Sequence, residues 1–151
     1  MKLWLMWKAH GDAGLEARID RLYGLAAIAT EHVKASAAAG GGLRIAVSGG
    51  CTNVCFFVVP RALRHLDTSS PAALAASAKT TDDVARLNRV APFVKDQMQR
   101  SGDQMVGFQA VDGLPNFFRL VFVSTSETLQ EREVTGALDR MVEISEQMDL
   151  D

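Results

Sequence analysis

Hydrophobic residues recur along this chain with two periods, one typical of helices and one typical of strands. Between Asp12 and Ala38 they return every three or four residues, which predicts a long amphipathic helix capped by the Asp12 side chain. Before it, the aromatic segment KLWLMWK (residues 2–8) should end at a turn over residues 10–12. The Gly-rich run at residues 37–42 should end the helix.

Two further helices are predicted in the second half of the chain. The first starts at residues 81–82 and ends at residues 101–102, and Pro92 inside it should either kink the helix or mark its true start. The second opens at Thr128, where Glu131 three residues later completes the pattern of a capping box.

Short segments with the composition of strands fall into two pairs. Residues 43–49 and 52–60 are separated by a hairpin-type turn, and residues 104–111 and 116–123 by an Asp-Gly turn. Hairpins joined by helices favour an α+β sandwich of two layers, with an antiparallel or mixed sheet covered by helices on one face. Residues 66–80 are small and polar, which favours a mobile surface loop.

Composition narrows the class of protein without naming a function. The chain has 151 residues and a net charge of −2 with interspersed acids and bases, so neither nucleic acid nor an anionic membrane is an expected partner. No apolar run approaches the ~20 residues of a membrane span. The five-residue apolar stretch near the start is too short for a signal peptide and leads into a helix. We expect a soluble, cytoplasmic protein.

The usual catalytic and metal-binding patterns are absent from the sequence. Cys51 and Cys55 have no nearby His or further Cys to complete a zinc site, so buried free thiols are expected, with redox or metal function as the alternative. The histidines at positions 10, 32 and 65 lie on unrelated segments and read as surface or helix-end residues. No lysine has the flanks of a Schiff-base lysine.

Arg119 stands out because it lies inside the apolar strand PNFFRLVFV (residues 115–123). The nearest acids in sequence are Asp112 and Glu127, and a buried unpaired guanidinium costs several kcal/mol. The residue therefore needs an anion or access to water. Two interpretations stay open at this point: an internal salt bridge, or a bidentate clamp for a carboxylate or phosphate of a ligand.

The segments KLWLMWKAHGDAGLEARI, TNVCFFVVP, RVAPFVKDQMQRSGDQMVGFQ and PNFFRLV, in this order, resemble the C-terminal part of the group II pyridoxal-phosphate-dependent decarboxylases. The glutamate and cysteine-sulfinate branches match better than the aromatic-amino-acid branch, and the resemblance covers residue 1 to about 148. The chain departs from the family pattern at Phe57 (usually tryptophan), at Phe108 and Ala110, in the apparent insertion at residues 66–80, and at residues 124–126. These departures leave the substrate preference open.

The resemblance implies the small C-terminal α+β domain of a fold-type-I enzyme, with residues 1–40 as linking helices from a large domain and residues 41–151 as the small domain. In such enzymes the arginine of the NFFR motif, here Arg119, binds the substrate carboxylate. The cofactor would be pyridoxal 5'-phosphate, the substrate an acidic amino acid such as glutamate or cysteine sulfinate, and the partners the large domain and a second subunit of a homodimer.

The lysine that bears the cofactor in this family lies in an Asn-Pro-His-Lys-like segment, which this sequence does not contain. We therefore expect the chain to be the C-terminal portion of a decarboxylase and inactive alone. The alternatives are a stand-alone carboxylate-binding module and a non-catalytic split subunit. The aromatic residues 3–7 should either present a surface that the large domain covers or fold back onto the chain's own sheet.

Overall fold

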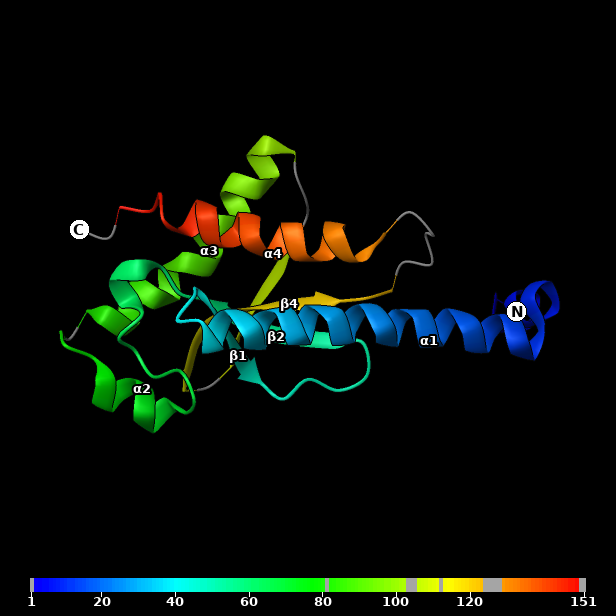
Figure 1. Cartoon of the computed structure of the whole chain (residues 1–151), viewed down its shortest axis with the longest axis horizontal. Coiled ribbons are helices and arrows are strands. Elements are labelled where there is room, and N and C mark those ends of the chain that lie inside the picture. The colour runs from blue at the N-terminus through cyan, green and yellow to red at the C-terminus, as the bar shows by residue number, and fades with distance from the viewer. Residues whose placement is uncertain (1, 81, 103–105, 112, 124–128, 150–151) are drawn as a thin grey trace.

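The computed structural model describes residues 2–80, 82–102, 106–111, 113–123 and 129–149. Within these ranges, two pairs of consecutive strands are preceded, separated and followed by helices (Figure 1). The elements in chain order are α1 (Lys2–Ala38), β1 (Leu43–Val47), β2 (Asn53–Val58), the 3₁₀ turn η1 (Arg61–Leu63), α2 (Pro71–Ser77), α3 (Asp83–Ser101), β3 (Gly107–Val111), β4 (Leu114–Val121) and α4 (Glu131–Ser145).

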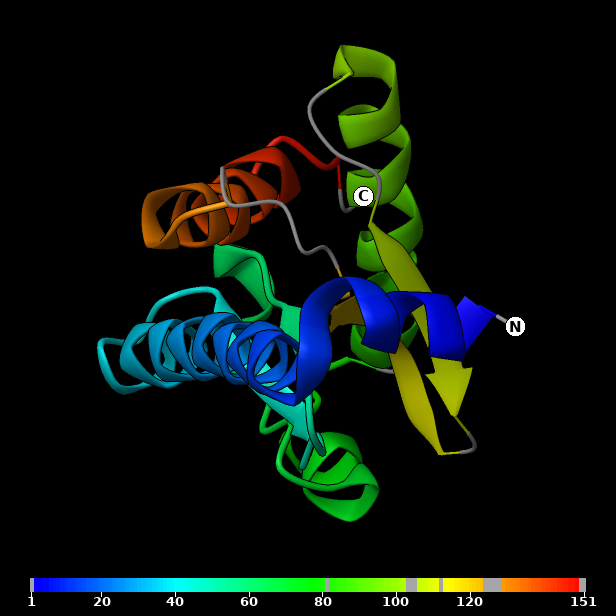
Figure 2. The same ribbon diagram turned by 90° about the vertical axis from the view of Figure 1, so that its right-hand side faces the viewer.

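The strands form one sheet in the order β1-β2-β4-β3, and every neighbouring pair is antiparallel. Helices α1, α3 and α4 pack on one face of this sheet, whereas α2 lies on the opposite side (Figures 1 and 2). The prediction of a helix-covered α+β fold is confirmed, and the sheet is antiparallel rather than mixed.

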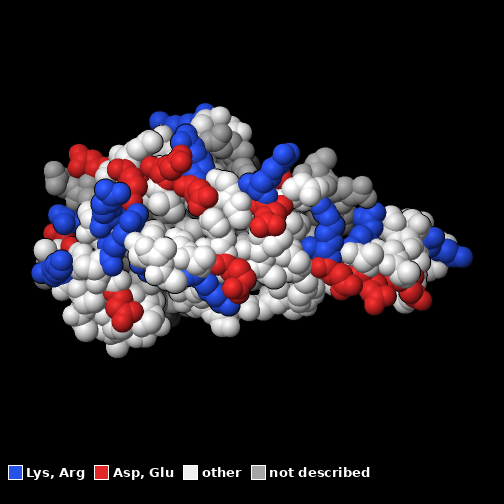
Figure 3. Space-filling model, viewed as in Figure 1, with Lys and Arg blue, Asp and Glu red and all other residues white. Residues whose placement is uncertain are grey.

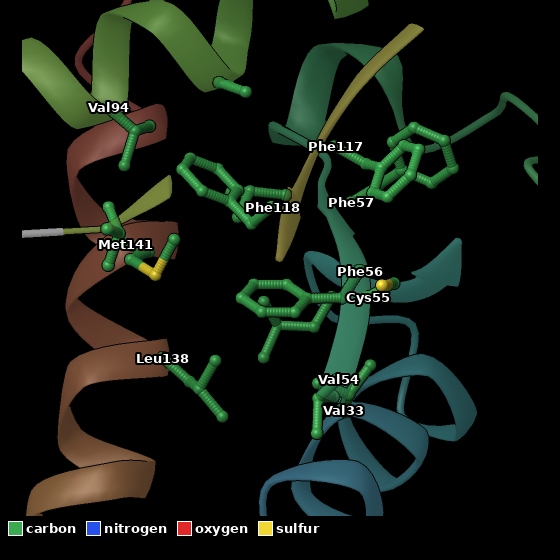
Figure 4. Packing of buried hydrophobic residues seen from close by; sticks show 14 of the residues in the cluster. Val33, Val54, Cys55, Phe56, Phe57, Val94, Phe117, Phe118, Leu138 and Met141 are labelled. Atoms are coloured by element: carbon green, nitrogen blue, oxygen red, sulfur yellow. The ribbon is translucent and has the colours of Figure 1, made fainter. Parts of the chain in front are cut away.

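Alternate residues of the central strands β2 and β4 face the helices and form the main core. Phe56 of β2 and Phe118 of β4 are directly opposite each other, and their rings stack with centroids 5.7 Å apart. They lie between the sheet and α3 and α4, facing Val94, Leu138 and Met141 (Figure 4). The period-two pattern of residues 116–123 therefore predicts correctly which side chains share a face of the sheet.

The opposite face of the sheet is covered over part of its area. Phe57 and Phe117 lie on it with their rings edge-on at 5.9 Å, and both are buried. The segment that follows β2 supplies η1 and α2, with three buried leucines at positions 63, 66 and 74. The prediction of a mobile loop over residues 66–80 is wrong over α2, because Ser70 caps a helix there by accepting a hydrogen bond from the Ala73 amide at 3.1 Å.

Helix α1 begins ten residues earlier than the sequence pattern indicates. The aromatic segment is itself helical, and the predicted turn survives as a kink at Gly11, whose φ of 65° is one that glycine adopts readily. The first half of α1 projects beyond the sheet (Figure 1), and Leu3, Trp4, Leu5, Met6 and Trp7 are 46–64% exposed. Of the two interpretations of this segment, folding back onto the chain's own sheet is therefore wrong.

The other two predicted helices form with changed ends. Pro92 lies within α3, which runs through it, so the proline does not mark the start of the helix. Helix α4 begins at Glu131, and its capping box joins Gln130 and Glu133 instead of Thr128 and Glu131. The backbone N–H of Gln130 donates a hydrogen bond to the Glu133 carboxylate at 2.9 Å. Thr128 itself lies outside the described residues.

A buried carboxylate holds the segment around α2 to the start of α3. Asp83 is 3% exposed and accepts hydrogen bonds from the Thr80 hydroxyl (2.6 Å), the amides of Lys79 (2.8 Å) and Thr80 (3.0 Å), and the ring of His65 (3.0 Å). The hydrogen bond from the Thr80 side chain does most to lower the pKa of the Asp83 carboxyl; burial opposes it, and the remaining hydrogen bonds add to the lowering.

Asp83→Asn is expected to lower the urea midpoint of unfolding at pH 7. Because the folded-state pKa of Asp83 lies below its unfolded value of about 3.9, the carboxylate stabilises the fold above that pH and loses this effect as pH falls through the folded pKa. The gap between wild type and variant should therefore narrow between pH 5 and pH 2, as measured by urea titrations at several pH values. A gap that stays constant over this range would exclude the carboxylate as the cause.

Candidate carboxylate-binding site

Arg119 lies near the end of β4, on the sheet face that α2 covers only in part. Its side chain is exposed, so the guanidinium has the access to water that was expected as one of its two requirements. The neighbouring Phe117 on the same face is fully buried, whereas Val121, two residues further along, is 38% exposed. The covered area therefore ends between Phe117 and Arg119. Periodicity identifies the face of the strand correctly but does not reveal where the cover stops.

Strand register sets the immediate neighbours of Arg119. Cys55 on β2 and Gly107 on β3 are its directly opposite partners. Beyond Cys55, the next residue in this row is Val47 on the edge strand β1, which is 36% exposed. Directly opposite residues of an antiparallel pair point to the same face with Cβ atoms about 5 Å apart. The guanidinium thus emerges from a surface of small and apolar side chains.

No acid neutralises this cation within the part of the chain that the structure describes. None of its strands contains Asp or Glu, and no ion pair joins Arg119 to another described residue. The described arginines with ion pairs use acids on or next to helices, as Arg64 does with Glu146, directly after α4, at 2.7 Å. For the described residues, the internal salt bridge expected as one alternative is absent. Charges of both signs are mixed over the face shown in Figure 3.

The thiol of Cys55 is the polar group closest to Arg119 in the strand register. Burial raises the pKa of this thiol, and the positive charge of Arg119 opposes that rise. Cys55 is therefore a neutral neighbour at physiological pH. It was expected as a buried free thiol and is one, whereas Cys51 is free but exposed, so the prediction of burial is wrong for Cys51. Nothing in the sequence alone indicates that Cys55 pairs with Arg119, because the pairing depends on long-range strand register.

Of the three histidines expected at the surface or at helix ends, only His10 is exposed, whereas His32 and His65 are partly buried and each contacts a carboxylate. His32 on α1 contacts Asp139 on α4 at 2.7 Å, and His65 contacts Asp83. His10 lies exposed in the first half of α1. None of them is a register partner of Arg119 on the sheet, so the sequence-predicted candidates do not gather around it.

A hollow of about 440 Å³ lies between α1 and the β1–β2 hairpin, and Cys55 lines it together with Tyr23, Thr30 and Cys51. Arg119 is not part of its lining. The Arg119 side chain is exposed and lies outside this hollow. A ligand bound there would be enclosed only if another body supplied the opposite wall.

The residues that the structure describes do not form a site that holds pyridoxal phosphate. The lysines with described contacts are engaged along the helices: Lys8 lies over the Trp4 ring, Lys95 over the Phe108 ring, and Lys34 pairs with Glu31 at 2.8 Å. The Asn-Pro-His-Lys segment is missing from the sequence. The sequence therefore lacks the segment that bears the cofactor in the family it resembles.

Comparison with known proteins identifies relatives over nearly the whole chain. Human cysteine sulfinic acid decarboxylase is 35% identical over 142 residues, which is 93% of this chain and 26% of the human protein. Bovine acidic amino acid decarboxylase GADL1 is 30% identical over 132 residues (87% and 22%), and Drosophila melanogaster glutamate decarboxylase is 29% identical over 140 residues (93% and 24%). The chain thus spans about a quarter of the length of these relatives. No family model matches it.

The same relationship holds for the fold. The crystal structure of mouse CSAD covers 97% of this chain with a TM-score of 0.80 and 31% identity, and 27% of the mouse chain is matched. Catharanthus roseus tryptophan decarboxylase matches with a TM-score of 0.67 at 19% identity, which is a likeness of fold alone. The architecture is therefore that of one portion of the pyridoxal-phosphate-dependent decarboxylases. Within that class, the chain is a homologue of the acidic amino-acid decarboxylases, as the sequence resemblance predicted.

No helix among the described residues is both long and apolar enough to cross a membrane.

Proposed function

We propose that this chain is the small C-terminal domain of a pyridoxal-phosphate-dependent decarboxylase for an acidic amino acid such as cysteine sulfinate or glutamate, and that Arg119 binds a carboxylate of the substrate. The observation that carries the proposal is the exposed guanidinium, which has no acidic partner among the described residues. A planar guanidinium suits a carboxylate because both can form two parallel hydrogen bonds.

Arg119 would act by positioning. A carboxylate held at one fixed point limits the orientations of the remaining substrate, and such preorganisation lowers the entropic part of the barrier. Pyridoxal phosphate supplies an acceptor for the electron pair released when carbon dioxide leaves. Its anchor has to come from a domain outside these 151 residues, so we expect the purified chain alone to bind no lysine-linked pyridoxal and to release no carbon dioxide.

The proposal assigns residues 1–40 to a link with a large cofactor-binding domain and residues 41–151 to the small domain, in an enzyme that is a homodimer in the cytoplasm. The exposed first turns of α1 support a covering partner. Their five consecutive apolar residues, at positions 3–7, form a patch of a kind that monomeric proteins seldom leave in water.

A chimera tests this function directly. The homologous portion of mouse CSAD, which matches this chain with a TM-score of 0.80, would be replaced by residues 1–151. We expect the chimera to bind pyridoxal phosphate and to release carbon dioxide from cysteine sulfinate or glutamate, while the 151-residue chain alone does neither. A folded chimera that binds the cofactor but decarboxylates neither acid would contradict the proposal.

Changing Trp4 and Trp7 together to glutamine should destabilise the chimera much more than the isolated chain. Both indoles are more than half exposed, so the double variant should change the unfolding free energy of the isolated chain by less than about 0.5 kcal/mol. If a large domain buries them, the chimera should lose at least about 2 kcal/mol. Urea titration of both proteins measures the difference, with Glu31→Gln on the same helix as the control. Equal effects in chain and chimera would exclude this segment from the domain interface.

A further inference from the structure

The neighbours of Arg119 on the sheet are small and uncharged on both sides. Cys55 on β2 is directly opposite Arg119 on one side of β4, and Gly107 on β3 is directly opposite it on the other side. Cys55 is 6% exposed, and Gly107 is exposed without a side chain. The row thus contains one cation with a thiol on one flank and a bare backbone position on the other.

A carboxylate side chain could be placed at position 55 or at position 107, next to Arg119. A Cβ atom added at Gly107 would meet nothing nearer than the Arg119 carbonyl oxygen at 3.9 Å, an ordinary contact distance. At Cys55, the side chain is already close enough for its ionisation to respond to the charge of Arg119. An aspartate at either position would stand directly across the strand from the guanidinium, the arrangement in which opposite charges pair.

We propose that positions 55 and 107 are specificity-determining: their neutral, small residues keep the Arg119 guanidinium available to an external anion and exclude an internal ion pair. This inference rests on the proposed function, since it assumes that Arg119 binds an acid. It adds that the binding capacity belongs to Cys55, Arg119 and Gly107 together and not to the arginine alone. A carboxylate in the row acts in two ways, by pairing with the guanidinium and by repelling the incoming anion.

Matched variants of the 151-residue chain separate charge from size. Cys55→Asp is compared with Cys55→Asn, and Gly107→Asp with Gly107→Asn, so that each pair differs only by a carboxylate against an amide. L-cysteine sulfinate is titrated into each protein labelled with ¹⁵N at arginine, and the shift of the Arg119 side-chain resonance gives the dissociation constant. We expect each aspartate variant to bind at least about tenfold more weakly than its asparagine counterpart.

Arg119→Ala serves as the control for binding at this site, and circular dichroism checks that each variant folds. If the ligand shifts the wild-type Arg119 resonance while aspartate and asparagine variants bind within twofold of each other, this inference fails and the proposed site stands. If Arg119→Ala binds as tightly as wild type by calorimetry, the proposed site itself fails. If the wild-type chain shows no saturable shift at Arg119, the same titrations are made with the cofactor-free chimera, which contains the large domain; no binding there, or equal binding by its Arg119→Ala variant, also rejects the proposed site. Should Cys55→Asp not fold, the Gly107 pair decides the matter, because position 107 is exposed and has space for a side chain.

Discussion

Arg119→Ala is expected to lower kcat/KM of the chimera for cysteine sulfinate by roughly 30- to 1,000-fold. Truncating one partner of a hydrogen-bonded charge pair costs about 2–4 kcal/mol, and each ~1.4 kcal/mol is tenfold in rate. Steady-state carbon dioxide release at several substrate concentrations measures the change and divides it between kcat and KM. A loss carried by kcat as well as KM would show that the arginine orients the substrate in the transition state and does more than attract it.

Two companion variants make this result specific. Arg119→Lys keeps the charge but loses the planar fork, so its kcat/KM should lie between those of wild type and the alanine variant. Arg100→Ala removes an arginine that is 74% exposed on α3 and should leave kcat/KM within about twofold. An Arg119→Ala chimera that retains cofactor and at least half of the wild-type kcat/KM would exclude a role in substrate binding.

Phe118→Ala is expected to destabilise the isolated chain by about 3–5 kcal/mol, the largest stability change predicted for this protein. The Phe118 ring is 1% exposed, stacks on Phe56 and faces α3 and α4 (Figure 4), so its removal leaves a cavity at the centre of the core. Domains of this size are stable by about 5–15 kcal/mol, and the change is therefore a large share of the total. Urea unfolding followed by circular dichroism measures it.

The control is Val123→Ala near the end of the same segment. Its side chain is 72% exposed, so the change should stay within about 0.5 kcal/mol. A loss of less than about 1 kcal/mol for Phe118→Ala would mean that the sheet and helices pack differently from the arrangement described above.

The strands were predictable from sequence because side-chain period reports which face a residue occupies. The assignment of Phe118 to one face and Arg119 to the other is correct for that reason. The exposure of Arg119 was not predictable, since it depends on how far the segment after β2 extends over the second face. The sequence pattern predicts a loop for that segment. Its signal was present in Ser70 and Pro71, an N-cap and a first-turn proline, but the run of small residues concealed it.

Helix ends show a second limit of local patterns. The sequence offers Thr128 and Glu131 as a capping box, and two residues later Gln130 and Glu133 form the one observed. Glutamine is an unusual N-cap, so preference alone selects the wrong pair. No local sequence pattern predicts that Cys55, Gly107 and Arg119 lie side by side, because strand pairing brings them together. Cys55 and Arg119 are more than fifty residues apart in the sequence. Only the family resemblance gave Arg119 a ligand.

The most direct measurement of the central claim is a crystal structure of the cofactor-free chimera soaked with L-cysteine sulfinate. The account predicts a carboxylate of the ligand on the Arg119 guanidinium, with two N–H···O contacts of about 2.7–2.9 Å. A ligand bound with its carboxylate on other residues, while Arg119 remains in solvent, would contradict it.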